Sequence, residues 1–227
     1  MSRLVEPHGG GTLKPLLAPQ AERAEELKRA EGLKKIPMTS REVSDVLMLS
    51  MGAYTPLDGF MGEADWRGAC LDMTLSSGLF WPIPVTLSAD KALADSIHDE
   101  EEVALVDSEN GRIMAVMRVT EKYAPDKALE CDHVFRTTDM AHPGVEKVMN
   151  QGEINLAGPV AVLDEGEFPS MFGDLYVRPN ESRAQFAEKG WSEVAAFQTR
   201  NPMHRSHEYL VKIAAEVTDG VFIHQVL

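Results

Sequence analysis

The chain has 227 residues, of which 44% are hydrophobic and 26% are charged. That length is enough for one large or two small domains with real cores. Because 36 Asp and Glu outnumber 22 Lys and Arg, the net charge is -14, which disfavours general binding to nucleic acid or to an anionic membrane. A substrate that is itself an anion would need a local cluster of basic residues.

Signals for a metal site or for export are few. The two cysteines, Cys70 and Cys131, are far apart and show no CxxC-like spacing, so they neither build a metal site nor demand an oxidising compartment. The first residues lack the apolar core of a signal peptide, and no apolar run approaches the roughly 20 residues that span a bilayer. We therefore expect a cytoplasmic protein without a membrane segment.

The first half of the chain begins with two predicted helices. A charged amphipathic helix is expected over 21–33, with mixed signs typical of a solvated face. Thr39 and Glu42 form a capping-box pattern at the start of a second helix, which Gly52 is expected to end.

Strand patterns follow these helices. We expect strands over 80–87, 103–106 and 158–163, and Asn110-Gly111 before 112–120 predicts a hairpin. Met114 and Met117 fall on the hairpin's second strand and are expected to fill the core. The polar, Gly-containing stretch 164–167 predicts a boundary between a β-rich domain, 1–166, and a second domain, 167–227.

The second domain is expected to be α/β with a parallel sheet. Its first helix is predicted to start at Pro179 and to close at Gly190. Apolar Val194–Phe197 then predicts a buried strand, Pro202 suits the first turn of a helix, and 221–227 predicts the next strand. Strand, helix and strand make a βαβ unit, whose ligands lie beyond the carboxyl ends of the strands.

The stretch between these two strands carries the strongest functional signal. A helix N-terminus offers unpaired N–H groups and about half a positive charge, which attract phosphate or sulfate. Arg200 adds a planar fork of donors, Gln198 and Asn201 donate without charge, and His204 and His207 are expected on one helix face. No carboxylate or thiol interrupts the stretch, so it favours oxyanion stabilisation over covalent catalysis.

Other interpretations of these residues stay open at this point. The two histidines could satisfy local backbone groups, and Arg-Asn-Pro is ordinary turn chemistry. Zinc is a third interpretation, but no Cys or further His lies nearby in sequence, and we predict no metal ligands. His133 and His142 fit structural roles in a loop-rich stretch, whereas His224, on the second strand, stays unassigned. GxGxxG, Walker A and GxSxG patterns are absent from the sequence.

Five segments, in order, resemble the ATP sulfurylase (sulfate adenylyltransferase) family of nucleotidylyltransferases. They are Leu13-Lys14-Pro15-Leu16, the run 54–61, Trp81-Pro82-Ile83-Pro84-Val85, Arg136-Thr137-Thr138-Asp139 with His142-Pro143-Gly144-Val145, and Gln198-Thr199-Arg200-Asn201-Pro202 with His204-Arg205-Ser206-His207. The family's Gly-Arg-Asp-His stretch is missing, since the only Gly-Arg pair is Gly111-Arg112. We therefore expect the N-terminal portion of such an enzyme, inactive on its own.

The resemblance implies a PUA-like β-rich domain followed by the start of a Rossmann-like nucleotidylyltransferase domain. It implies transfer of AMP from ATP to sulfate, with Mg²⁺ delivered by ATP, and a homo-oligomer. Sulfate would be held by Gln198 and Arg200. ATP would be bound by Gln198, Asn201, His204 and His207. The reacting groups would be positioned by Thr199 and Asn201. Thr199, Arg200, Asn201, His204 and His207 are the implied catalytic residues. The alternatives are an adenylyltransferase for another acceptor and a non-catalytic regulatory fragment that binds nucleotide or anion.

Overall fold

The computed structural model describes residues 4–225, which divide into two compact units. The larger unit is His8–Tyr176, and the smaller one comprises 177–225 together with residues 4–7. In the smaller unit the Arg183 guanidinium donates a hydrogen bond to the carbonyl oxygen of Val5 at 2.5 Å. The domain boundary expected at residue 166 precedes this division and stays a prediction.

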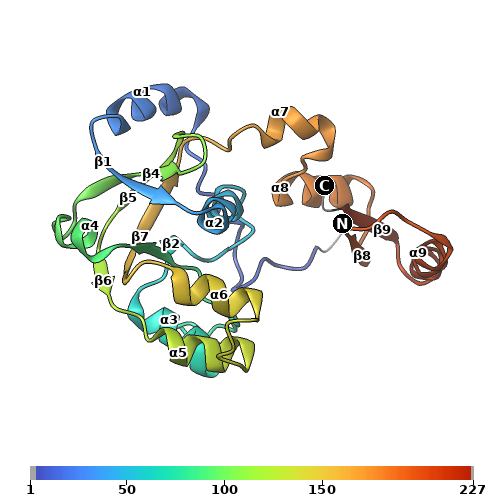
Figure 1. Ribbon diagram of the computed structural model, residues 1–227. Helices are drawn as coiled ribbons and strands as arrows, with labels where there is room; N and C mark the ends of the chain where they lie inside the picture. The colour runs from blue at the N-terminus through green and yellow to red at the C-terminus, as the bar shows by residue number, and fades with distance from the viewer. Residues whose placement is uncertain (1–3, 226–227) are drawn as a thin grey trace. The chain divides into compact units, whose positions relative to one another are not determined.

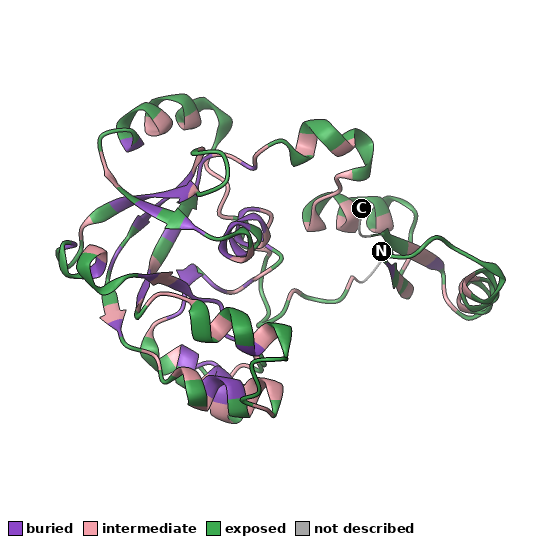
Figure 2. Ribbon diagram, in the orientation of Figure 1, coloured by how far each residue is buried: buried purple, intermediate pink, exposed green. Residues whose placement is uncertain are grey.

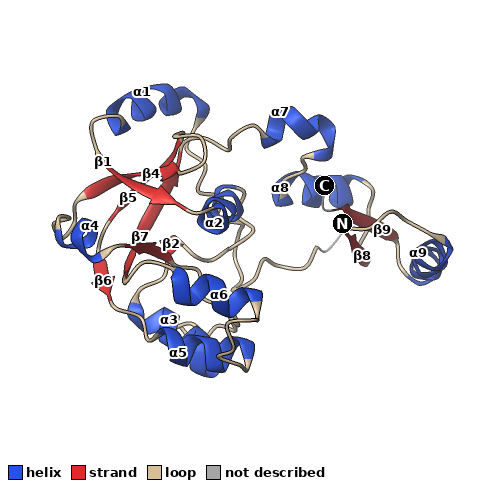
Figure 3. Cartoon of the chain, in the orientation of Figure 1, coloured by secondary structure: helices blue, strands red, loops and turns tan. Residues whose placement is uncertain are grey.

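The larger unit is built on a curled sheet of parallel and antiparallel strands (Figure 3). Its central path runs β1-β4-β5-β7-β2, and β3 and β6 also pair with β7. The strands are β1 (Lys34–Met38), β2 (Gly59–Phe60), β3 (Leu87–Ala89), β4 (Glu102–Asp107), β5 (Ile113–Arg118), β6 (Glu121–Tyr123) and β7 (Ile154–Val162). Only β1 and β4 pair in parallel, and the other pairings in this sheet are antiparallel.

Strand β7 organises this sheet because four other strands pair with it along its length. Gly158, at φ 150°, lies in the middle of β7. A Cβ at this position would collide with the carbonyl oxygen of Arg118, so only glycine lets the two backbones approach this closely. The strand expected over 158–163 is confirmed, although it begins four residues earlier, at Ile154.

The larger unit also contains helices, most of which lie around this sheet in Figure 1. They are α1 (Gln20–Ala30), α2 (Ser40–Ser50), α3 (Glu63–Asp72), α4 (Lys91–Asp95), α5 (Lys127–Glu130), the π-helix η1 (Cys131–Phe135), α6 (Pro143–Asn150), α7 (Phe168–Phe172) and the 3₁₀-helix η2 (Gly173–Leu175). The two helices predicted near the N-terminus are both present. The capping box is confirmed, since the Glu42 carboxylate accepts a bond from the Thr39 backbone N–H at 2.8 Å.

The main core lies between this sheet and α2, where buried residues are concentrated (Figure 2). Val43, Val46 and Leu49 of α2 are buried, as is Leu105 of β4, and Met114 and Met117 of β5 are core residues as predicted. The hairpin expected at Asn110-Gly111 is also confirmed, with Gly111 at φ 75°. Burial of this apolar surface is the main term that stabilises the larger unit.

A buried acidic side chain lies at the edge of this core. The carboxylate of Asp45 accepts hydrogen bonds from Arg41 Nη1 at 2.8 Å and from the Tyr54 hydroxyl at 3.1 Å. Burial nevertheless raises the pKa of Asp45 to about 6, because desolvation of the carboxylate outweighs the attraction of Arg41. The folded state therefore holds the proton of Asp45 more tightly than the unfolded chain does.

The strand expected over 80–87 is wrong for most of its length. Only Leu87 of that run belongs to a strand, β3, while Phe80 makes an isolated bridge with Thr74. Pro82 and Pro84 have no N–H to donate to a ladder, which explains why apolar residues between them do not pair. The sequence patterns also failed to predict β1, which contains Pro37, and the short helices between α2 and β7.

The smaller unit contains two helices and two strands. They are α8 (Pro179–Glu188), β8 (Val194–Thr199), α9 (Arg205–Val217) and β9 (Gly220–Gln225). The helix predicted from Pro179 to Gly190 is confirmed, and Gly190 closes it at φ 71°. The last two residues of the strand expected over 221–227 lie outside the described residues.

Candidate anion site

The two strands of the smaller unit pair in parallel and are joined by α9, so the predicted βαβ unit is confirmed. Their register places Gln198 beside His224 and Thr199 beside Gln225. Figure 1 shows β8 and β9 between α8 and α9. The carboxyl ends of both strands therefore meet at one edge, which is where ligands of open α/β sheets bind.

The opposite ends of these strands are fixed by Asp219. Its carboxylate accepts hydrogen bonds from the backbone N–H groups of Ser192 and Glu193, at 2.7 and 3.0 Å, and from the Ser192 hydroxyl at 2.9 Å. The bond from the Ser192 backbone is the largest of the contributions that lower the pKa of Asp219. These bonds set the register in which the functional ends align.

The turn after β8 is shaped by Thr199, a buried residue within a largely exposed segment. Its hydroxyl accepts a bond from the Asn201 backbone N–H and donates one to the Asn201 carbonyl oxygen, both at 3.1 Å. Arg200 and Asn201 are both exposed. Thr199 thus holds the backbone that presents the Arg200 side chain to solvent.

Helix α9 starts later than its sequence predicts. We expected Pro202 in the first turn, but the first helical residue is Arg205 and His204 is the N-cap. The cap explains the shift, because the His204 ring accepts a hydrogen bond from the Ser206 backbone N–H, and this fixes the start of the helix three residues after Pro202. His204 and His207 therefore come together as cap and third helical residue, and not as two residues of one helix face.

The two histidine rings are 3.9 Å apart between centroids, at an interplanar angle of 37°. His204 Nδ1 accepts from the Ser206 N–H at 3.4 Å and lies 2.8 Å from the Ser206 hydroxyl. His207 Nδ1 accepts from the His204 backbone N–H at 3.4 Å. A neutral imidazole whose Nδ1 accepts from an N–H carries its proton on Nε2. Each ring therefore retains one N–H donor for a ligand.

The two faces of the β8–β9 pair carry different side chains. His207 packs against Phe197, with ring centroids 5.7 Å apart, so this face of the strands is covered by α9. Phe186 of α8 packs against Phe222 of β9 at 5.7 Å, which places α8 on the other face. Since alternate residues of a strand point to opposite faces, Gln198 and His224 share the α8 face.

Chemically, this edge supplies donors and positive charge. Its candidates are the Arg200 guanidinium, the Gln198 and Asn201 amides, the two imidazole rings and the N-terminus of α9. Such a set suits two anions close together. Two residues at this edge were not predicted to take part. The register of β8 and β9 places His224 beside Gln198. The Ser206 hydroxyl lies within hydrogen-bond distance of His204 Nδ1.

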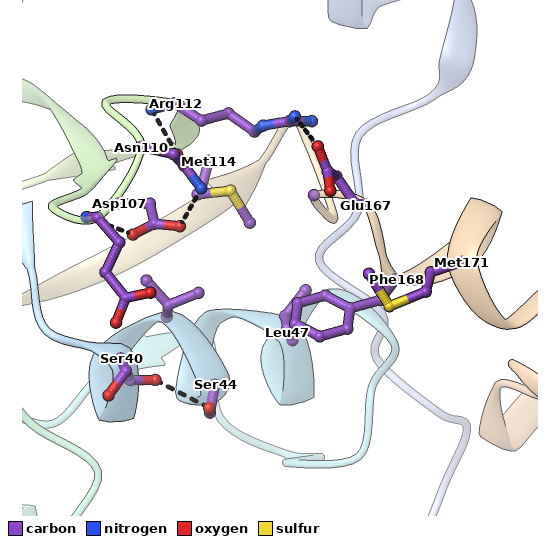
Figure 4. Close-up of a pocket in the computed structure, with 13 residues that line it drawn as sticks. Ser40, Ser44, Leu47, Asp107, Asn110, Arg112, Met114, Glu167, Phe168 and Met171 are labelled. Carbon is purple, nitrogen blue, oxygen red and sulfur yellow. Dashed lines mark hydrogen bonds and ion pairs between the residues drawn. The ribbon is translucent and has the colours of Figure 1, made fainter. Parts of the chain in front are cut away.

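A separate cavity of about 250 Å³ lies in the larger unit, between α2, the β4–β5 hairpin and α7 (Figure 4). Arg112, the basic residue of its lining, is 3.3 Å from the Asp164 carboxylate and 3.5 Å from that of Glu167. Asn110 donates to Asp107 at 2.7 Å. Arg112 and Asn110 thus have acidic partners within the protein, and the sequence analysis predicted no site residue in this cavity.

Two further observations concern only residues 4–225. No cluster of three or more His, Cys, Asp or Glu side chains in this range is arranged to hold a metal ion. None of the helices in the same range is long and apolar enough to cross a membrane.

The comparisons with known proteins agree with the two units. Residues 5–165 match the family model of the PUA-like domain, and residues 173–227 match that of ATP-sulfurylase. The chain is 60% identical over its whole length to a sulfate adenylyltransferase of Syntrophobacter fumaroxidans. It is 58% identical, over 99% of its length, to a sulfate adenylyltransferase of Chlorobaculum tepidum. The chain spans 56% of the length of each of these relatives.

A solved structure supports the same fold. The hexameric APS kinase from Thiobacillus denitrificans matches 98% of the chain with a TM-score of 0.74 and 32% identity, and the match covers 39% of that protein. The expected architecture, a β-rich PUA-like domain followed by an α/β unit with a parallel sheet, is therefore confirmed. The chain belongs to the PUA-like domain family through residues 5–165, and its residues 173–227, which include the β8–α9–β9 unit, match the ATP-sulfurylase model.

Proposed function

We propose that the full-length protein is a sulfate adenylyltransferase, which transfers AMP from ATP to sulfate and releases pyrophosphate. The observation that carries this proposal is the parallel β8–β9 edge, where Gln198, Arg200 and Asn201 precede a helix N-terminus capped by two histidines. Relatives at 58–60% identity bear that name, although the chain spans about half their length.

In this proposal Gln198 and Arg200 bind sulfate. The Arg200 guanidinium can contact two sulfate oxygens with parallel N–H donors, while the Gln198 amide donates without adding charge. Both side chains are exposed at the end of β8 or just beyond it. Arg200 also meets the need for local positive charge in a chain whose net charge is -14.

The other substrate, ATP, is bound by Gln198, Asn201, His204 and His207. The Nε2–H groups of both histidines would donate to phosphate oxygens near the α–β bridge, where negative charge increases in the transition state. Thr199 acts with Asn201 to position the reacting groups, because its hydroxyl fixes the Asn201 backbone.

The reaction needs no general base. Sulfate is a dianion at neutral pH, and one of its oxygens forms a bond to the α-phosphorus while the bond from that phosphorus to the bridging oxygen breaks. The electron pair leaves with pyrophosphate. Catalysis therefore rests on in-line alignment and on neutralising charge, as in phosphoryl transfer generally. In the reverse reaction, the same site makes ATP from adenylyl sulfate and pyrophosphate.

Mg²⁺ would be delivered with ATP and would neutralise charge on its phosphates. The site residues fit this assignment, because Gln, Thr, Arg, Asn and His side chains here are donors to anions, whereas Mg²⁺ prefers carboxylate and phosphate oxygens. The phosphates of the nucleotide would thus supply ligands that these residues do not.

In the same proposal, the full-length protein is a soluble cytoplasmic homo-oligomer whose substrates are small molecules. The negative net charge supports a protein that does not bind nucleic acid or membranes. The structural neighbour is described as hexameric, which supports assembly of this protein from several copies.

Release of pyrophosphate from ATP by the full-length protein tests the proposal. We expect release that depends on sulfate, with Mg²⁺ present. Turnover that ignores sulfate and requires an organic phosphate acceptor would show that the reaction is that of another adenylyltransferase. Nucleotide binding without turnover under any of these conditions would instead favour a regulatory protein.

A further inference from the structure

Strand β9 adds a histidine to the candidate edge. His224 lies directly beside Gln198 in the parallel register, one rung before the end of β8. Neighbouring strands are about 4.8 Å apart, and paired residues point to the same face. The side chains of Gln198 and His224 therefore start close enough to contact one small tetrahedral anion.

The environment of His224 leaves its ring available. Its ring stacks against Phe222 at 5.8 Å between centroids, with an interplanar angle of 15°, and the residue is exposed. Phe222 in turn packs against Phe186 of α8, so an aromatic support lies behind the imidazole. A ring held on one side and open on the other is suited to donate a hydrogen bond to a ligand.

The sheet separates the donors of this edge into two groups. His207 packs on the α9 face through Phe197, and His204 stacks against it. Gln198 and His224 lie on the opposite, α8 face. Under the proposed function, His204 and His207 on the α9 face bind ATP and not sulfate, whereas Gln198 on the α8 face contacts sulfate as well as ATP. The α8 face is therefore the one that reaches sulfate, and His224 lies on it.

We propose that His224 is a sulfate-binding residue that acts with Gln198 on the α8 face of the β8–β9 pair. This proposal rests on the proposed function, because it takes sulfate as one of the two anions. It adds a second strand to the sulfate site, so that the anion is held between the ends of β8 and β9 and not by the turn after β8 alone.

The test is an NMR titration of the full-length protein, in which the signals of His204, His207 and His224 are assigned by substituting each in turn. Imidazole signals are followed while inorganic sulfate and MgATP are added separately. We expect sulfate to shift the signals of His224 and MgATP to shift those of His204 and His207. His224→Ala should weaken sulfate binding by about 10-fold, the effect of losing one hydrogen bond to a charged group, and change MgATP affinity by less than about 2-fold.

Two further variants control this experiment. His224→Gln keeps a side-chain N–H donor and should recover part of the lost affinity for sulfate. His98→Ala removes an exposed histidine from the larger unit and should change neither affinity. Circular dichroism checks that each variant is folded.

The outcomes separate this inference from the proposed function. If sulfate and MgATP shift His204 and His207 while His224 is unmoved and His224→Ala binds sulfate normally, only the assignment of His224 is overturned. Equal losses of affinity for both anions in His224→Ala would also overturn it, since the two groups would then not be separate. If neither anion moves any histidine signal, both the proposed function and this inference fail.

Discussion

The two units of the chain differ in how far their side chains are buried. The larger unit buries a continuous apolar core, with residues such as Leu105, Met114 and Leu156 at 0–1% exposure. Among residues 177–225, only Thr199 and Gly220 are buried, and the polar residues of the β8 edge are open to solvent. Substitutions should therefore change stability in the first unit and ligand binding in the second.

The largest stability effect should come from a core leucine. Leu105→Ala removes a fully buried side chain from β4 and should lower the free energy of unfolding by about 2–5 kcal/mol, through lost burial and the cavity left behind. Leu210→Ala is the matched control, because Leu210 of α9 is 53% exposed and should cost about 0.5 kcal/mol or less. Urea unfolding measures both. Equal losses would contradict the contrast in burial.

A titration effect of similar size is expected at Asp45. Its pKa is about 6 in the folded state, against 3.8 for an unperturbed aspartate, so the folded protein binds this proton more tightly than the unfolded chain. Its contribution to stability is therefore fully present below about pH 4 and is lost as the pH rises through 6, a change of about 3 kcal/mol.

Comparison with Asp45→Asn isolates this contribution. The quantity compared is the difference in free energy of unfolding, that of the unsubstituted chain minus that of the variant. This difference should fall between pH 4 and pH 6 and stay level above pH 6. Asp95→Asn, at an exposed position paired with Lys91, should change stability by less than about 0.5 kcal/mol. Parallel stability curves for the unsubstituted chain and Asp45→Asn would mean that burial does not control this carboxyl group.

A smaller effect in the second unit is expected at Gly220. A Cβ added here would collide with the Trp191 ring, so Gly220→Ala should destabilise the β8–β9 pair by about 1–3 kcal/mol through overpacking. Gly32→Ala is the control, since its Cβ would be 3.6 Å from the Arg29 carbonyl oxygen, an ordinary contact. Hydrogen exchange of the β8 and β9 amides measures the local loss. Unchanged protection would show that the pair tolerates movement of Trp191.

The smallest effect tests a single cap. Thr39→Ala removes the hydroxyl that donates to Glu42 at 2.7 Å at the start of α2, and should cost about 1 kcal/mol. Ser44→Ala, at an exposed position of the same helix, should change stability by less than about 0.5 kcal/mol. Thermal unfolding of both variants provides the comparison. A loss at Ser44 as large as that at Thr39 would count against the capping box.

The sequence predicted elements whose signals are local. The Thr39–Glu42 capping box, the Asn110-Gly111 hairpin and the β8–α9–β9 order each depend on a few neighbouring residues, and all are present. Predictions failed where tertiary contacts decide. Prolines interrupt 80–87, whereas β1 pairs in parallel with the distant strand β4 despite containing Pro37.

The candidate site was predictable in part for the same reason. Gln198 to His207 form one continuous motif, so its residues could be named from sequence. His224 could not be assigned, because its proximity to Gln198 depends on the register of two strands. The start of α9 was misplaced because a histidine cap is not among the common N-cap residues that sequence patterns use.

The most direct test of the central claim is sulfate-dependent release of pyrophosphate by the full-length protein carrying Arg200→Ala, measured beside its melting temperature. Arg200 is exposed in the turn after β8, so its loss should leave the melting temperature nearly unchanged. Turnover should fall by about 100-fold or more, as when one oxyanion donor is removed. A large drop in melting temperature with turnover preserved would contradict the account, because Arg200 would then serve the fold and not the anion.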